Sequence, residues 1–167
     1  MPVVVVDSSV LISLAAGEQF SLLHDFYSVI FIPPEVWNEV VSSPKPFGAK
    51  EARHAQMDGW LVIQKPKELS KVMSLPFALQ AGETEALALA MQFQDPLLLV
   101  DDAQGRRAAQ VLRIAYTGTL GVLLRAKKEG KIAELRSVLN LLMQRTHFWL
   151  GEDVYKAALQ KAGELNA

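Results

Sequence analysis

Val3-Val4-Val5-Val6-Asp7-Ser8-Ser9 opens the chain with four β-branched residues in a row, followed by an acid and two hydroxyls. An apolar run without polar alternation is typical of a parallel strand that helices cover on both faces. The three polar residues are favourable helix N-caps, so a helix is expected over the apolar residues 10–16. This stretch therefore predicts a strand, a sharp exit and a helix, which is the beginning of an α/β sheet.

The rest of the chain repeats the alternation of strand and helix. Strands are expected over Val3–Val6, Val29–Ile32, Leu61–Ile63, Leu97–Val100 and Ile114–Tyr116. Helices are expected over residues 10–16, 18–26, 34–41, 49–57, 68–73, 83–93, 103–112, 120–129, 132–144 and 151–162. The pattern predicts a three-layer α/β/α fold with a mostly parallel central sheet and a helical C-terminal tail. A length of 167 residues, without repeats or linkers, indicates a single domain over residues 1–167.

Composition excludes several kinds of site. The chain has no cysteine, which rules out disulfides, thiolate zinc sites and cysteine nucleophiles. Its three histidines, His24, His54 and His147, are not spaced as metal ligands. The 17 basic and 18 acidic residues nearly balance, so net charge neither predicts nor excludes a nucleic-acid partner. The N-terminus lacks signal-peptide features and no apolar run reaches about 20 residues, so we expect a cytoplasmic protein without a membrane segment.

Two of the predicted strands end in aspartate. Asp7 follows the first strand, and Asp101-Asp102 follows the strand over residues 97–100. In open parallel sheets, ligands bind beyond the carboxyl ends of the strands, which is where these side chains are expected. For Asp7, a role as a helix cap alone is an equal alternative. The aspartate pair is harder to explain in this way, because like charges at a buried strand end repel unless a cation joins them.

Two predicted helices supply further acids. Glu39 shares one flank of the helix over residues 34–41 with Glu35, and periodicity alone favours a solvated surface position for both. Glu83 lies in the first turn of a helix that is apolar nearly all round, where the helix dipole favours an acid whatever its function. Because such a helix must be buried, its acidic end has to open onto a polar region. The carboxyl ends of the strands are the expected location of that polar region.

Taken together, these acids have the character of a site for a hard cation, with oxygen ligands, no cysteine and no paired histidine. Carboxylates that converge without a cation repel one another, which raises their pKa values. Mg²⁺ or Mn²⁺ would relieve this repulsion and engage phosphate oxygens. The residues therefore predict metal-assisted chemistry at a phosphate.

Five segments of the chain also carry a family resemblance. They are VVDSSVLI at residues 5–12, IPPEVWNEV at 32–40, GETEALALA at 82–90, LLVDDAQGR at 98–106 and TGTLGVL at 117–123. In their order and spacing, the chain resembles the PIN-domain family, in a branch related to the ribonuclease toxins of bacterial and archaeal toxin–antitoxin pairs. The similarity extends over almost the whole chain.

The resemblance implies a ribonuclease that cleaves RNA with Mg²⁺ or Mn²⁺. It implies that Asp7, Glu39, Glu83 and one aspartate of the 101–102 pair hold the metal or its waters. Asp101 and Asp102 both stand as candidates for that fourth position. At the third position the family often has Asp where this chain has Glu83, and Glu85 is close enough in sequence to compete with it.

The same resemblance suggests further contacts and partners. Ser9 falls where the family often has a hydroxyl that helps to position the site. Arg106 is a candidate to contact a substrate phosphate, with a surface salt bridge as the alternative. An RNA substrate, an antitoxin protein and a second copy of the chain are the expected partners.

Two other groups of residues favour structural interpretations. The densest basic strip consists of Arg125, Lys127, Lys128 and Lys131. A helix C-terminus attracts such cations in any case, and contact with RNA is the alternative. The three tryptophans are expected in the core or an interface rather than under a nucleobase; they are Trp37, Trp60 and Trp149.

Two alternative functions are compatible with these residues. A phosphatase or receiver domain also places aspartates at strand ends around Mg²⁺, but Ser9 stands where the haloacid-dehalogenase type needs its second aspartate. A catalytically inert PIN scaffold that binds RNA or a protein partner is the other alternative, because catalysis requires a geometry that sequence alone does not show.

Overall fold

Five parallel strands form the central sheet of the computed structural model, which describes residues 2–42, 44 and 47–165. The strands are β1 (Val4–Val6), β2 (Ile30–Ile32), β3 (Leu61–Ile63), β4 (Leu97–Leu99) and β5 (Ala115–Thr117). They are ordered β3-β2-β1-β4-β5, and every neighbouring pair is parallel. The predicted parallel sheet is confirmed, and the sheet is parallel throughout these strands.

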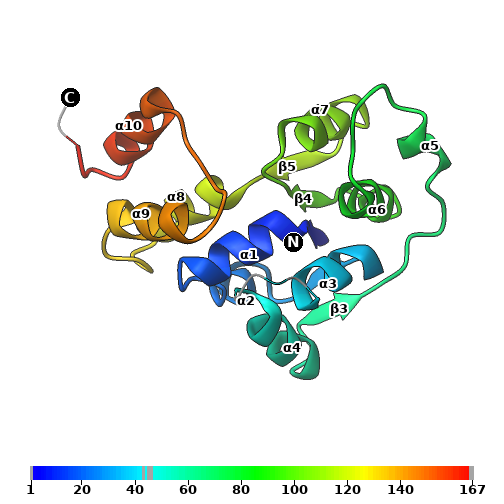
Figure 1. Cartoon of the computed structure of the whole chain (residues 1–167), viewed down its shortest axis with the longest axis horizontal. Coiled ribbons are helices and arrows are strands. Elements are labelled where there is room, and N and C mark those ends of the chain that lie inside the picture. Colours follow the sequence, from blue (N-terminus) through cyan, green and yellow to red (C-terminus); the bar gives the residue numbers. More distant parts are fainter. Residues whose placement is uncertain (1, 43, 45–46, 166–167) are drawn as a thin grey trace.

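Helices flank the sheet in a three-layer α/β/α arrangement (Figure 1). They are α1 (Ser8–Ala16), α2 (Leu22–Tyr27), α3 (Pro34–Val41), α4 (Ala49–Met57), α5 (Ser70–Met73), α6 (Ala81–Ala90), α7 (Ala103–Val111), α8 (Thr119–Lys128), α9 (Leu135–Arg145) and α10 (Glu152–Lys161). The last three form the predicted helical tail, in which α9 packs against α1 and α8, and α10 against α8. Within the described residues, no helix is long and apolar enough to span a bilayer.

The core explains why β1 has an uninterrupted apolar sequence. Val4, Val5 and Val6 are fully buried because the strand is central and covered on both faces. The apolar stretch of α6 is also buried, from Ala86 to Ala90, and α6 packs against β1, β4 and α3. These contacts bring the beginning of α6 to the edge of the sheet at which β1 ends.

The strand register brings two aspartates to the same edge. Val6 of β1 is paired with Leu99 of β4, and the backbone N–H of Asp7 donates to the Leu99 carbonyl at 2.9 Å. Asp7 therefore leaves β1 beside the point where β4 leads into Asp101. This juxtaposition follows from the crossover that makes β1 and β4 neighbours, although some 90 residues separate them in the sequence.

Several helix boundaries differ from the predicted ones. The helix predicted over residues 18–26 begins at Leu22, because Glu18 adopts a left-handed backbone conformation (φ 59°) that separates it from α1. The helix predicted to begin at Glu83 begins two residues earlier, with Glu83 in its first turn and its side chain accepting from the Gln80 N–H. Both differences arise at helix ends, where capping decides the boundary.

Candidate active site

A cavity of about 510 Å³ opens at the carboxyl edge of the sheet. All five predicted acids line it: Asp7, Glu39, Glu83, Asp101 and Asp102. They come from the ends of β1 and β4 and from α3 and α6, and the residues that connect α9 to α10 form the opposite wall. The structure therefore brings together side chains that are distant in sequence.

Asp7 is the deepest of these acids. Its side chain is 3% exposed, its Oδ2 accepts from the Ser9 hydroxyl at 3.2 Å, and Oδ1 has no hydrogen-bond partner among the described residues. Burial raises the pKa of Asp7 to about 7, and the negative charges of Glu83 and Glu39 add to the effect. A buried carboxylate with one unpaired oxygen is an unfavourable arrangement that a cation would relieve.

Glu39 enters the pocket from α3 and lies against the beginning of α6. Its Oε2 accepts a short hydrogen bond from the Ser8 hydroxyl, so the residue is not the free surface side chain that periodicity favoured. A Cβ added at Gly82 would lie 2.1 Å from Glu39 Oε1. The glycine therefore makes the close approach of α6 to this carboxylate possible, and neither Ser8 nor Gly82 was singled out in the sequence as a site residue.

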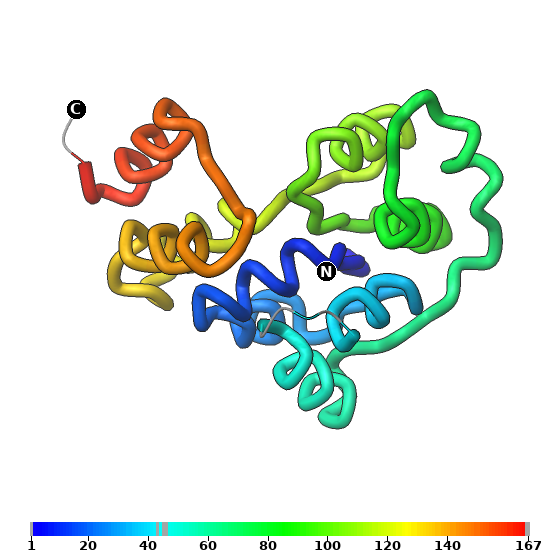
Figure 2. The backbone as a smooth tube through the Cα atoms, in the orientation of Figure 1, coloured from blue at the N-terminus to red at the C-terminus, as the bar shows by residue number. Residues whose placement is uncertain are grey.

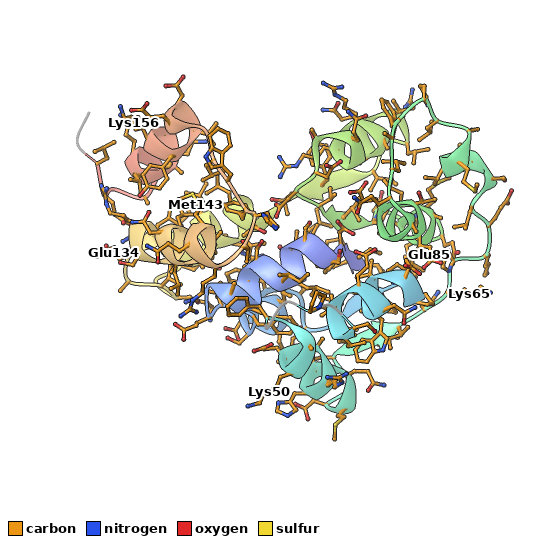
Figure 3. All side chains as sticks on the ribbon, in the orientation of Figure 1. Lys50, Lys65, Glu85, Glu134, Met143 and Lys156 are labelled. Carbon is orange, nitrogen blue, oxygen red and sulfur yellow. The ribbon has the colours of Figure 1, made fainter. Side chains whose placement is uncertain are left out.

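The structure separates Glu83 from its competitor Glu85. Glu83 faces the pocket, and its pKa is raised by burial, by Asp102 and by Glu39. Glu85, which Figure 3 labels, accepts from the backbone N–H of Glu35 at 2.9 Å. It also lines a second cavity of about 370 Å³. Glu85 thus stabilises the N-terminal turn of α3, where a carboxylate is favoured by the free N–H groups and the helix dipole.

The two aspartates of the 101–102 pair also differ in their hydrogen-bond partners and exposure. Both oxygens of Asp101 accept from Thr119, from its backbone N–H at 2.8 Å and its hydroxyl at 2.7 Å, and Thr119 is fully buried. Asp102 is the N-cap of α7, and its Oδ2 accepts from the N–H groups of Gln104 and Gly105. Asp101 therefore anchors the first turn of α8, whereas Asp102 is exposed and carries its charge beside Glu83.

Arg106 is held at the rim of the pocket. Its Nε donates to the Val100 carbonyl at 3.0 Å, and its guanidinium lies over the Tyr116 ring at 5.6 Å. Its distance to Asp101 is 3.9 Å, which is long for a salt bridge. A partly exposed guanidinium fixed in this way can reach an anion in the pocket, so both sequence-based alternatives for Arg106 remain compatible with its position.

The opposite wall was not predicted from the sequence. It consists of Thr146, His147, Phe148, Trp149, Leu150 and Val154. Trp149 is 77% exposed, which excludes the core and leaves the interface alternative for this residue, whereas Trp37 and Trp60 are packed against the core as expected. Only the tertiary fold brings the α9–α10 connection to the acids, and no local sequence signal indicates it.

Most of the basic strip is engaged within the chain. Arg125 stacks over Phe26 at 4.1 Å, Lys127 pairs with Glu164 at 3.2 Å, and Lys131 pairs with Asp25 at 3.7 Å. None of the four strip residues lines the acidic pocket. These contacts support the structural interpretation of the basic strip.

The pocket fits a hard divalent cation in its chemistry. Among residues 2–42, 44 and 47–165, no three acidic or histidine side chains are close enough to ligate one ion together. Mg²⁺, however, is usually held by one or two carboxylates and keeps several waters. The unpaired Oδ1 of Asp7 and the oxygen-only set of side chains around it match such a site. Asp7, Glu39, Glu83 and Asp102 would hold the ion or its waters.

The chain has a parallel α/β fold, and its acids gather beyond the carboxyl ends of the strands. Folds of this kind usually bind their ligands at that edge of the sheet. The model of the family DUF3368, a PIN domain, matches residues 3–164, and the chain belongs to this family. PIN domains are generally nucleases and typically use divalent metals, which supports a hydrolase that acts on nucleic acids. No curated protein matches the chain.

Proposed function

We propose that the chain is a Mg²⁺- or Mn²⁺-dependent ribonuclease that hydrolyses RNA phosphodiester bonds in the acidic pocket. The observation that carries the proposal is the buried, half-unpaired carboxylate of Asp7 among three further pocket acids, Glu39, Glu83 and Asp102. Membership of the PIN-domain family supports the same class of reaction. Among the described residues, Asp7 is the only buried acid.

The chain's own residues have distinct roles in this proposal. Burial, reinforced by the charges of Glu83 and Glu39, favours the protonated form of Asp7, and a cation bound beside it would favour the ionised form. Ser8 and Ser9 hold the carboxylates of Glu39 and Asp7 in place. Arg106 orients a substrate phosphate from the rim. A divalent cation bound here supplies positive charge for phosphate oxygens and lowers the pKa of nearby water.

The test is cleavage of a labelled single-stranded RNA by the purified protein. Cleavage is expected with Mn²⁺ or Mg²⁺, and EDTA or the substitution Asp7→Asn should remove it. Glu85→Gln is the matched control, because this acid lies outside the pocket and a glutamine oxygen can still accept from the Glu35 N–H. Cleavage that survives both EDTA and Asp7→Asn would overturn the proposal.

An inert PIN scaffold that binds RNA or a protein is the alternative. It is favoured by the lack of a three-ligand group among the described side chains. A calorimetric titration with Mn²⁺ separates the two, since an inert scaffold is not expected to bind the ion at the acids.

The toxin role is a finer proposal that rests on the ribonuclease activity. Growth arrest on expression is expected if the chain is a toxin, with relief by Asp7→Asn. An antitoxin protein would then bind the chain and restore growth. Arrest by both the parent chain and the variant would argue against this role.

A further inference from the structure

The wall of the pocket opposite the acids presents one large aromatic side chain to solvent. Phe148 and Leu150 pack against the core, whereas Trp149 between them is 77% exposed and lines the pocket. Of the aromatic rings in the described part of the chain, none is stacked on Trp149. Its ring is therefore accessible to a ligand that enters the pocket.

The segment that carries Trp149 is fixed at both ends. The Thr146 hydroxyl donates to the Leu142 carbonyl at 2.8 Å and accepts from the Phe148 N–H at 3.1 Å. On the other side, the Tyr155 hydroxyl donates to the Asn140 side chain at 2.8 Å, which ties α10 to α9. Figure 2 shows this connection, in orange, between α9 and α10. These hydrogen bonds therefore hold the backbone in place on both sides of Trp149.

The surroundings of the ring indicate what it binds. Gly151 follows two residues after Trp149, and a Cβ added there would be in ordinary van der Waals contact with the ring at 3.8 Å. The same cavity holds Asp7 and Arg106 on its other side, and its volume of about 510 Å³ is within the range of small-ligand pockets. One nucleotide can thus place its phosphate toward the acids and its base toward the tryptophan.

We propose that Trp149 is a stacking platform for a nucleobase of single-stranded RNA, next to the phosphate at the acidic site. The inference rests on the proposed ribonuclease function and adds a substrate-binding residue to it. Bases of single strands are free to stack on aromatic side chains, whereas bases within a duplex are already stacked on one another. The site therefore selects unpaired RNA.

The experiment measures binding, so that it does not depend on turnover. In a Glu83→Gln background with Mg²⁺, the affinity for a labelled short oligouridylate is compared for the parent and for Trp149→Ala. Base–aromatic stacking predicts a loss of about 5- to 150-fold in affinity. Trp149→Phe should retain most of the affinity. Met57→Ala is the matched control, because Met57 is equally exposed (79%) but lies outside the pocket, and it should have no effect.

A second measurement identifies the contact as stacking. The oligonucleotide carries one abasic nucleotide at successive positions, and the loss at the critical position should not add to the loss caused by Trp149→Ala. RNA quenching of tryptophan fluorescence should disappear in Trp149→Phe, since Trp37 and Trp60 are packed against the core. A duplex of the same sequence should bind more weakly than the single strand.

The outcomes separate this inference from the proposed function. If Trp149→Ala binds RNA as tightly as its parent, the inference is wrong, even where the wild-type protein cleaves RNA. If it changes the sedimentation of the protein rather than its RNA affinity, Trp149 belongs to a protein interface and the inference is again wrong. If the affinity falls as predicted while the wild-type protein does not cleave, stacking is supported and the ribonuclease proposal fails.

Discussion

The buried carboxylate of Asp7 makes a prediction about stability that is independent of catalysis. Its pKa is raised from an ordinary 3.8 to about 7 in the folded protein, mainly by burial. The folded state therefore binds the proton more tightly than the unfolded state, so this group destabilises the fold as pH rises from about 4 to about 7. The substitution Asp7→Asn removes the charge and should make the protein more stable at pH 8 in EDTA.

The magnitude follows from the two pKa values. Each tenfold change in proton affinity is worth about 1.4 kcal/mol, so ionised Asp7 costs about 4 kcal/mol at pH 8 as an upper bound. The buried amide of asparagine lacks a full set of partners, which costs about 1–3 kcal/mol. The expected net gain is about 2 kcal/mol, or roughly 4–8 °C in Tm for a chain of this length.

The assay is thermal unfolding by circular dichroism between pH 5 and pH 8, in EDTA and then in Mn²⁺. The advantage of Asp7→Asn should shrink toward pH 5, and Mn²⁺ should stabilise the wild-type protein more than the variant. Asp95→Asn, the same change at an exposed position, is the control and should leave Tm unchanged. A variant that is less stable than wild type at pH 8, or whose advantage does not depend on pH, would refute the reasoning.

Four further predictions concern the other acids and Gly82. Glu83→Gln should lower RNA cleavage at least tenfold while Glu85→Gln retains it; equal losses in a cleavage assay would contradict the separation of these two acids. Asp101→Asn should lower the stability of the fold by about 1–3 kcal/mol in urea unfolding, through its lost acceptor. Asp102→Asn should reduce cleavage with little change in stability, because asparagine is an equally good N-cap. Gly82→Ala should keep or raise Tm, because alanine favours a helix over glycine by about 1 kcal/mol. It should nevertheless reduce cleavage, because the added Cβ would displace the Glu39 carboxylate on α3. Unchanged cleavage in this variant would show that the reaction does not require the Glu39 carboxylate at this position.

The fold was largely predictable because its signals are local. The run of valines before Asp7 and the leucines before Asp101 read directly as buried strands, and all five predicted strands are present in the structure. The parallel sheet then placed the aspartates at one edge without any knowledge of side-chain contacts. The strand order, with β1 between β2 and β4, is a tertiary result that no local pattern encodes.

The details of the site were not predictable, because they depend on contacts that only the tertiary fold creates. Glu83 and Glu85 are two residues apart, and only the packing of α3 against α6 assigns Glu85 to the Glu35 N–H. The contact of Thr119 with Asp101 spans 18 residues of sequence, so no local pattern indicates it. Trp149 belongs to the pocket because the tail folds back over the sheet edge, which its own sequence does not indicate.

The proposed ribonuclease activity requires that the carboxylates beyond β1 and β4 hold a divalent cation. A crystal soaked in Mn²⁺ and measured at the manganese absorption edge tests this claim directly. The predicted result is an anomalous peak within bonding distance of Asp7 Oδ1, with Glu39, Glu83 and Asp102 around it, which is absent in Asp7→Asn. An empty pocket at saturating Mn²⁺, or a peak only elsewhere on the protein, would contradict it.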